Sequence, residues 1–286
     1  SYGEANYLKG GIVYGDAVTT VSPTYAYEIT TPEGGEGLDG LLYACRNKLY
    51  GILNGIDDVE YNPKTDPFIE AQYDSRNVQQ GKAKNKAKLQ QMMGLEENES
   101  IFLLGMVSRM TDQKGFDLIA YVMDEMLAKE KIQFVVVGTG EDRYQDMLHY
   151  FAGKYPGRVS VTIGYSESLA HQVYASCDGF LMPSLFEPCG LSQLMSLRYG
   201  TVPIVRETGG LKDTVVAYNE YTKEGTGFSF ANYNAHEMLR TIQYALSVYY
   251  GQRADWKQLV EQGMQADFSW RKSAKKYEDL YQKITC

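Results

Sequence analysis

The sequence predicts an α/β protein built on a doubly wound parallel sheet. From residue 101 onward, short apolar runs rich in β-branched residues alternate with amphipathic stretches of helical length. The runs are continuously apolar, which is expected of strands that helices bury on both faces. Gly, Ser and Pro residues occupy the connections, as they do in turns. Together these patterns are typical of a Rossmann-like domain.

The elements follow one another as strand, loop and helix. The expected strands are residues 101–107, 133–137, 159–163, 179–182 and 201–205. The expected helices, each after a polar or Gly-containing turn, are residues 117–128, 142–153, 168–176, 191–199, 254–265 and 271–284. In such a sheet ligands bind at the carboxyl ends of the strands. The loops between each strand and the next helix are therefore the expected place for a site.

Residues 1–52 follow a different pattern. Residues 7–14 predict a helix, residues 17–21 a strand, and residues 32–40 a loop rich in Gly and Glu. With only one expected strand, this segment would not close a core of its own. The chain also begins without methionine. We therefore interpret it as a piece of a longer protein.

Composition and charge exclude several function classes. Hydrophobic residues make up 44% of the 286 residues and charged residues 22%, as in globular proteins. A net charge of -8 gives no support to binding of nucleic acid or anionic membranes. The basic run at residues 82–88 has no interleaved aromatic residue, so we expect the solvated start of a helix there.

Cysteines and apolar runs indicate the compartment. The four cysteines lie far apart without a CxxC pair, which predicts neither a zinc site nor disulfides and favours a reducing, cytoplasmic setting. No apolar run approaches the ~20 residues that span a bilayer. The N-terminus also lacks the pattern of a signal peptide. We expect a soluble protein without a membrane partner.

The loop after the first expected strand carries fixed positive charge. Residues 108–115 read Ser-Arg-Met-Thr-Asp-Gln-Lys-Gly, which places Arg109 and Lys114 at the expected crevice. Two cations there suit a diphosphate, because hydrogen bonds between charged groups are strong. A solvated surface loop with two ordinary charges is the alternative.

Glycines in the next loop, Gly138 and Gly140, would let backbone approach a phosphate or ribose. This pattern lacks the full GxGxxG, and such turns are common. A later loop, residues 206–213, repeats the arrangement with Gly209 and Gly210, which equally suit a turn without a ligand.

The loop at residues 183–193 gives the strongest signal. Glu187 precedes a proline, and a glycine opens the next helix. The amides of Gly190, Leu191 and Ser192 would point outward at the helix start, where anions are favoured. Glu187 would face whatever the phosphate carries. A helix-capping acid is the alternative for Glu187, although the following proline disfavours a capping box.

Other reactive side chains fall outside these loops. The three histidines, His149, His171 and His236, lie in helix-like stretches, so core or surface roles are expected. Cys189 has no histidine nearby in sequence and is expected to be a packing residue, not a nucleophile.

Together these loops resemble bacterial glycogen and starch synthases. Residues 108–115 resemble the V-S-R-x-T-x-Q-K-G motif, and residues 187–193 the E-P-C-G-L-S/T-Q motif. The resemblance runs in the family's order from residue 6 to residue 280, with further matches at residues 20–25, 53–57, 163–165, 208–211 and 213–215.

The resemblance implies a GT-B architecture of two Rossmann-like domains around a cleft. It implies that residues 1–52 are the tail of a missing N-terminal domain and that 53–268 form the donor-nucleotide domain. Residues 269–286 would then be a helix crossing back toward the N-terminal domain. The family's K-x-G-G-L loop and active-site histidine would lie in the missing part.

The resemblance also implies roles for single residues in a retaining transfer of glucose from ADP-glucose to the non-reducing end of an α-1,4-glucan. Arg109 and Lys114 would neutralise the diphosphate, and Glu187 would hold the glucose hydroxyls. Gly190, Leu191 and Ser192 would bind the distal phosphate. The remaining expected donor contacts are Ser108, Gln113, Gly140, Tyr165 (packing on the adenine), Cys189 and Asn54.

No cofactor or metal is expected, because these loops carry neither an Asp-x-Asp motif nor clustered carboxylates. Related transferases carry a second glutamate eight positions after the first, where Met195 stands here; sucrose synthases and many lipid or mannosyl transferases are thereby disfavoured. A non-catalytic module for nucleotide sugars or glucans is the open alternative. An epimerase is disfavoured because the crevice shows no acid/base pair. The choice between ADP- and UDP-glucose rests on the resemblance alone.

Overall fold

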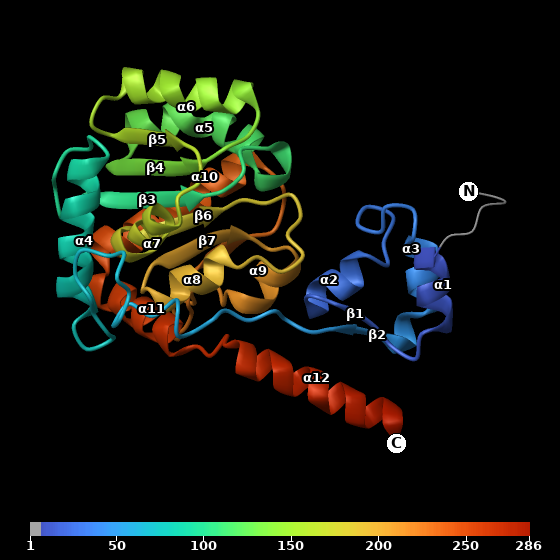
Figure 1. Ribbon diagram of the computed structural model, residues 1–286. Coiled ribbons are helices and arrows are strands. Elements are labelled where there is room, and N and C mark those ends of the chain that lie inside the picture. The colour runs from blue at the N-terminus through green and yellow to red at the C-terminus, as the bar shows by residue number, and fades with distance from the viewer. Residues whose placement is uncertain (1–6) are drawn as a thin grey trace.

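The computed structural model describes residues 7–286, and its centre is a six-stranded parallel sheet (Figure 1). The strands lie in the order β5-β4-β3-β6-β7-β8. Their bounds are β3 Phe102–Val107, β4 Ile132–Gly138, β5 Val159–Ile163, β6 Gly179–Met182, β7 Val202–Arg206 and β8 Phe228–Phe230. The predicted parallel α/β sheet is confirmed.

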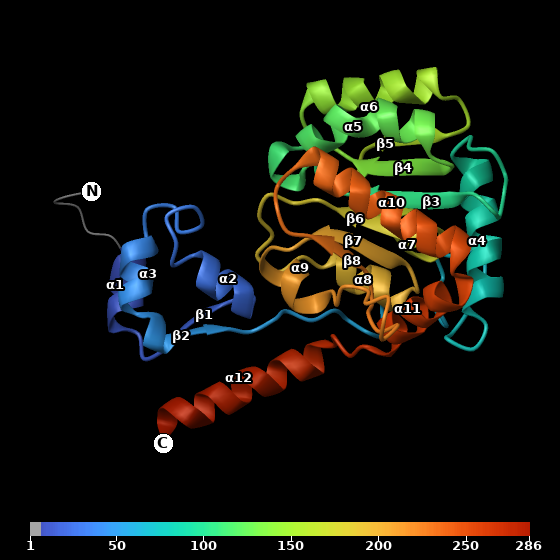
Figure 2. The ribbon, with the colours of Figure 1, turned by 180° about the vertical axis from the view of Figure 1, so that it is seen from behind.

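Helices cover both faces of this sheet. Helices α7 and α8 lie in front of it in Figure 1, and α10 lies in front of it in the reverse view of Figure 2. The helices of this part are α4 Val78–Met92, α5 Phe116–Lys129, α6 Asp142–Lys154, α7 Glu167–Ser176, α8 Ser192–Arg198, α9 Gly209–Thr214, α10 Ala235–Gly251 and α11 Arg253–Gln265. Every residue of β4 is buried, as expected for a strand covered on both faces.

The five expected strands are present, and the bounds of β5 and β6 are the predicted ones. The last strand of the sheet, β8, was not predicted, nor was α10, and of α4 only the start of a helix at residues 82–88 was expected. The expected helix is present at the basic run, but its solvated character is only partly confirmed: residues 82–88 form the middle of α4, where Lys84 and Lys88 are exposed, Lys86 is buried and Lys82 is half-buried. Lys86 pairs with Asp178 at 2.8 Å, and Lys82 donates to the Thr201 hydroxyl at 2.7 Å. Lys82 and Lys86 therefore connect α4 to the sheet domain.

The N-terminal segment is a separate small unit beside the main sheet (Figure 1). It contains α1 Tyr7–Tyr14, β1 Val18–Thr20, α2 Pro23–Glu28, α3 Asp39–Ala44, a short 3-10 turn at Arg46–Lys48 and β2 Leu49–Gly51. The expectation of a single strand was wrong, because β2 pairs in parallel with β1. The unpredicted strand is only three residues long and half-buried, so it leaves little sequence signal.

This segment contacts the main sheet domain through α2 and α9. The Thr24 amide donates to the Asp213 carboxylate at 2.9 Å, and the Gly209 amide donates to Glu28 at 2.9 Å. These contacts place the end of α2 beside the loop that follows β7.

The C-terminal helix α12, Trp270–Thr285, has no buried residue and extends away from the sheet domain in both views. Its start is held to residues 53–56, where the Ile56 amide donates to the Phe268 carbonyl at 2.9 Å. The proposed domain boundaries at residues 52 and 268 stay predictions. Within residues 7–286, no helix combines the length and the apolar character required to cross a bilayer.

Candidate active site

The sheet has one point where the chain changes direction. From β3 the chain continues to β4 and β5 on one side, and it then returns to β6 on the other side of β3. The loops after β3 and β6 consequently diverge, and a crevice is expected between them.

A pocket lies at this point. Its lining comes from the ends of β3 and β6 and from the loops that follow them: Met106, Val107, Ser108, Arg109, Lys114, Leu181, Met182, Ser184, Glu187, Gly190, Leu191 and Ser192. The structure thus brings together Ser108, Arg109, Lys114, Glu187, Gly190, Leu191 and Ser192 from the expected set. These residues are far apart in sequence, and the parallel topology is what assembles them.

A glycine sets how closely the two loops approach. Gly115 has φ +82°, and a Cβ at this position would lie 2.2 Å from the carbonyl oxygen of Pro183. The loops are also joined by the Leu185 amide, which donates to the Gln113 carbonyl at 2.8 Å. Because both contacts are made by backbone, Lys114 is held against the β6 loop.

Lys114 and Glu187 form an ion pair inside the pocket. The Lys114 Nζ lies 2.7 Å from Glu187 Oε2, and the two side chains are only 18% and 9% exposed. The Ser184 hydroxyl donates to the same carboxylate oxygen at 3.2 Å. The ammonium has three donors, so the pair leaves some of them available to a ligand. Arg109 is exposed at the rim and adds a second positive charge.

The loop between Glu187 and α8 is shaped by one side chain. The Gln193 amide donates to the carbonyls of Cys189 and Gly190 at 2.9 and 3.0 Å. Gly190 has φ +73°, a left-handed conformation that favours glycine. Helix α8 begins at Ser192, and the first N–H groups of a helix have no partner within it. Gly190, Leu191 and Ser192 line the pocket beside Glu187, so an unpaired amide at the start of α8 is available to donate to an anion there.

Five expected contact residues do not line this pocket. Gly140 lies in the loop after β4, and Tyr165 is 74% exposed beyond the end of β5, two strands from β3. Gln113 contributes its carbonyl to the loop contact described above. Cys189 is buried near the backbone of Asn54, and burial raises the pKa of its thiol. Their roles toward a ligand stay predictions.

Some residues of the site were not predicted. Ser184 orients Glu187, and the Tyr174 hydroxyl donates to Ser192 Oγ at 3.1 Å from the neighbouring helix α7. Gly210 donates its amide to the Glu187 carbonyl at 3.1 Å, so the glycines after β7 hold this loop. Ser184 is a small residue in the loop already singled out, whereas no sequence pattern indicates the contact made by Tyr174.

Metal-ligating side chains do not gather in this pocket among the described residues. The three histidines lie in α6, α7 and α10, as expected. The side chains close enough to share an ion are Glu60, Glu167 and His171, and none of them lines the pocket.

Comparison with known proteins agrees with this geometry. Residues 87–262, more than half of the chain, match the family model "Glycosyl transferases group 1", and residues 1–44 match "Starch synthase catalytic domain". The chain therefore belongs to the group 1 glycosyltransferases. The predicted resemblance to bacterial glycogen and starch synthases is confirmed by the relatives that follow.

The chain is 62% identical over 284 residues to a glycogen synthase of Lachnospira eligens and 56% identical over 283 residues to one of Geobacillus thermodenitrificans. These matches cover 99% of this chain but only 59% and 58% of those proteins. The chain thus spans less than two thirds of the length of the curated relatives it matches.

Among solved structures, the catalytic domain of starch synthase IV from Arabidopsis thaliana, bound to ADP and acarbose, matches with a TM-score of 0.88 at 38% identity. That match covers 98% of this chain and 58% of the plant protein. A glycosyltransferase from Rickettsia africae matches at 0.66 and 16% identity over 100% of this chain and 69% of its own, which shows the fold alone. The GT-B assignment of the sheet domain is confirmed.

Proposed function

We propose that this chain is the donor-nucleotide half of a retaining glucosyltransferase that transfers glucose from ADP-glucose to the non-reducing end of an α-1,4-glucan. The observation that carries the proposal is the convergence of Arg109, Lys114 and the amides before α8 on one pocket beside Glu187. Such a pocket fits a diphosphate with a sugar attached. The similarity to glycogen synthases and to a starch synthase bound to ADP supports this choice of donor and acceptor.

The same groups suit the chemistry of transfer. As the bond from glucose to the diphosphate breaks, negative charge grows on the departing phosphate while the sugar becomes oxocarbenium-like. The Arg109 and Lys114 cations and the amides of the loop would stabilise that charge more strongly than the ground state, which lowers the barrier. Glu187 would accept hydrogen bonds from the glucose hydroxyls. We propose that neither a metal nor a cofactor takes part in this step.

For the chain by itself we propose nucleotide binding with little or no transfer. The relatives are longer, and a GT-B cleft needs both of its domains. The partners would be the nucleotide sugar, the glucan and the remaining domain of the same enzyme, with no nucleic acid or membrane. The cytoplasm is the proposed compartment, which agrees with four free cysteines.

Titration with ADP, ADP-glucose and UDP-glucose tests the proposal. We expect ADP to bind the parent chain and to bind Arg109→Ala and Lys114→Ala more weakly, with ADP-glucose preferred over UDP-glucose. Addition of EDTA is expected to leave the affinity unchanged. Equal ADP affinity in the parent and both variants would refute the site.

The open alternative, a non-catalytic module for nucleotide sugars or glucans, predicts the same binding. Transfer of labelled glucose to glycogen by a longer protein that includes the missing domain separates the two. Activity that is lost in Arg109→Ala supports the transferase, and tight donor binding without any transfer supports the module.

A further inference from the structure

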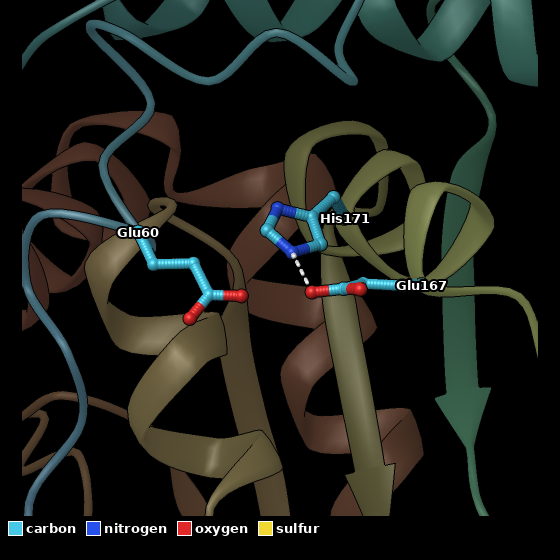
Figure 3. A group of neighbouring side chains, drawn as sticks. All are labelled: Glu60, Glu167 and His171. Atoms are coloured by element: carbon cyan, nitrogen blue, oxygen red, sulfur yellow. Dashed lines mark ion pairs between the residues drawn. The ribbon is translucent and has the colours of Figure 1, made fainter.

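A second polar cluster lies at the start of α7, away from the pocket. It consists of Glu60, in the segment that connects β2 to α4, and of Glu167 and His171 on α7 (Figure 3). Glu167 and His171 are four residues apart, so they lie on the same face of the helix. One oxygen or nitrogen from each of the three side chains lies within 4.8 Å of the others.

The imidazole of His171 is held in one orientation. It is 1% exposed, and its Nδ1 lies 2.6 Å from the fully buried carboxylate of Asp66. The ring of Tyr61 stacks on it at 4.6 Å, and Phe68 packs against it edge-on at 5.0 Å. With Nδ1 donating to a carboxylate, the lone pair of the neutral ring is on Nε2.

Nε2 has no hydrogen-bond partner among the described residues, although it is buried. The nearest charged group is Glu167 Oε1, at 4.0 Å, which is too long for a hydrogen bond (Figure 3). A buried nitrogen without a partner is unfavourable unless something binds it. The free lone pair points toward the two carboxylates.

The carboxylates of Glu60 and Glu167 also lie against each other. One oxygen of each lies within 4.8 Å of the other, and both lie within the same distance of the His171 imidazole. Two acids so close to one another favour either a shared proton or a bound cation.

We propose that Glu60, Glu167 and Nε2 of His171 form a binding site for a divalent transition metal, with Zn²⁺ as the best fit. Imidazole and carboxylate together suit Zn²⁺ better than Mg²⁺ or Ca²⁺, which prefer oxygen alone. A histidine that binds a metal usually donates its other ring N–H to a carboxylate or carbonyl, and Asp66 accepts that hydrogen bond from Nδ1 of His171.

The geometry requires only a small adjustment. Ligand atoms of a tetrahedral zinc lie roughly 3.4 Å apart, given Zn–N and Zn–O distances near 2.1 Å. The two glutamates are exposed, so their carboxylates can move about 1 Å nearer to Nε2 while His171 stays in place. Water would complete the coordination. The site shares no residue with the phosphate pocket and therefore goes beyond the proposed function.

Calorimetric titration of Zn²⁺ into untagged, chelator-treated protein tests this proposal. We expect one ion per chain, with affinity reduced at least about tenfold in both Glu60→Gln and Glu167→Gln. These two residues are exposed, so the variants are expected to fold. Glu97→Gln, which removes an exposed carboxylate elsewhere, is the matched control and should bind as the parent does.

Two results would overturn the proposal. The first is that the parent protein binds no Zn²⁺, which would mean that the carboxylates share a proton instead. The second is that both glutamine variants bind Zn²⁺ as tightly as the parent, which would place the ion at the exposed His149, His236 or Cys286. Neither result bears on nucleotide binding, which is measured without metal.

Discussion

Replacement of Lys114 by methionine is the most informative change at the phosphate pocket. Its side chain is 18% exposed and its ammonium lies 2.7 Å from Glu187, so the neighbouring carboxylate fixes it in the pocket before a ligand arrives. Methionine keeps most of the length of the side chain and removes the charge. A hydrogen bond to a charged group contributes about 1.5–3 kcal/mol, and 1.4 kcal/mol corresponds to a factor of ten. We therefore expect ADP to bind roughly 10- to 100-fold more weakly.

The same substitution leaves the Glu187 carboxylate buried without its cation, which destabilises the fold. Glu187→Gln separates the two effects, because the amide keeps an acceptor oxygen and carries no charge. In the Lys114→Met, Glu187→Gln double variant we expect the stability of the single lysine variant to be partly restored, and ADP to remain weakly bound. By itself, Glu187→Gln is expected to weaken the binding of ADP-glucose more than that of ADP, because Glu187 is proposed to hold the glucose hydroxyls.

Isothermal titration with ADP measures the affinity, and thermal unfolding measures the stability of each variant. Lys129→Met is the matched control, because Lys129 is 63% exposed at the far end of α5. If Lys114→Met and Lys129→Met bind ADP equally well, Lys114 does not contact the diphosphate and the assignment is wrong.

Three further predictions concern structure around the sites. Gly115→Ala should destabilise the protein by about 1–3 kcal/mol in chemical denaturation and weaken ADP binding, because its Cβ would meet backbone at a positive φ. Asp66→Asn should lose about 1.5–3 kcal/mol at neutral pH, because the hydrogen bonds that the buried carboxylate accepts weaken when it becomes a neutral amide. Although burial opposes ionisation, hydrogen bonds from His171 and other groups lower the pKa of Asp66 below 3.8. The difference in unfolding free energy between the parent and Asp66→Asn should therefore have its full size above pH 3.8 and decrease below it. Iodoacetamide should label exposed Cys286 in the native protein but reach Cys189, whose thiol pKa is raised by burial, only on unfolding.

Each of these has a contrary result. Unchanged stability in Gly115→Ala would mean that the two loops are not in close contact. A gap between parent and Asp66→Asn that widens as the pH falls from 4 to 2 would show the Asp66 carboxyl to be neutral in the folded protein. Native-state labelling of Cys189 at the rate of Cys286 would show it to be accessible.

The sheet was predictable because its strands are buried on both faces. The apolar run that became β6 is buried along most of its length, and its observed bounds equal the predicted ones. The bounds of β5 also match, although this edge strand alternates apolar residues with Ser160 and Thr162 and is only partly buried. Helix α10 also buries residues at helical spacing, among them Met238, Ile242 and Leu246, so its signal was present in the sequence although it was not used.

The bounds and buried face of helix α4 could not be found in this way, although a helix was expected to start in its basic run. Its buried face includes Asn85, Lys86 and Gln90, which are polar and obscure the apolar periodicity. Lys86 is tolerated there because Asp178, 92 residues away, neutralises it. Sequence reasoning does not reveal that partner, and an isolated basic run is therefore interpreted as exposed.

The candidate site was predictable only in part, because the topology of the sheet can be inferred from sequence but contacts between distant side chains cannot. The rule that strand ends converge at one edge correctly placed Arg109, Lys114 and Glu187 together. The contact between Lys114 and Glu187 spans 73 residues, and no spacing rule gives it. His171 was expected to have a core or surface role, and its pairing with Asp66 across 105 residues was equally hidden.

A crystal structure of this chain with ADP would show directly whether the phosphate pocket binds the nucleotide. We expect the distal phosphate between Arg109 and Lys114, within hydrogen-bond distance of the amides of Gly190, Leu191 and Ser192. ADP bound elsewhere on the molecule, with this pocket lacking phosphate, would contradict this expectation.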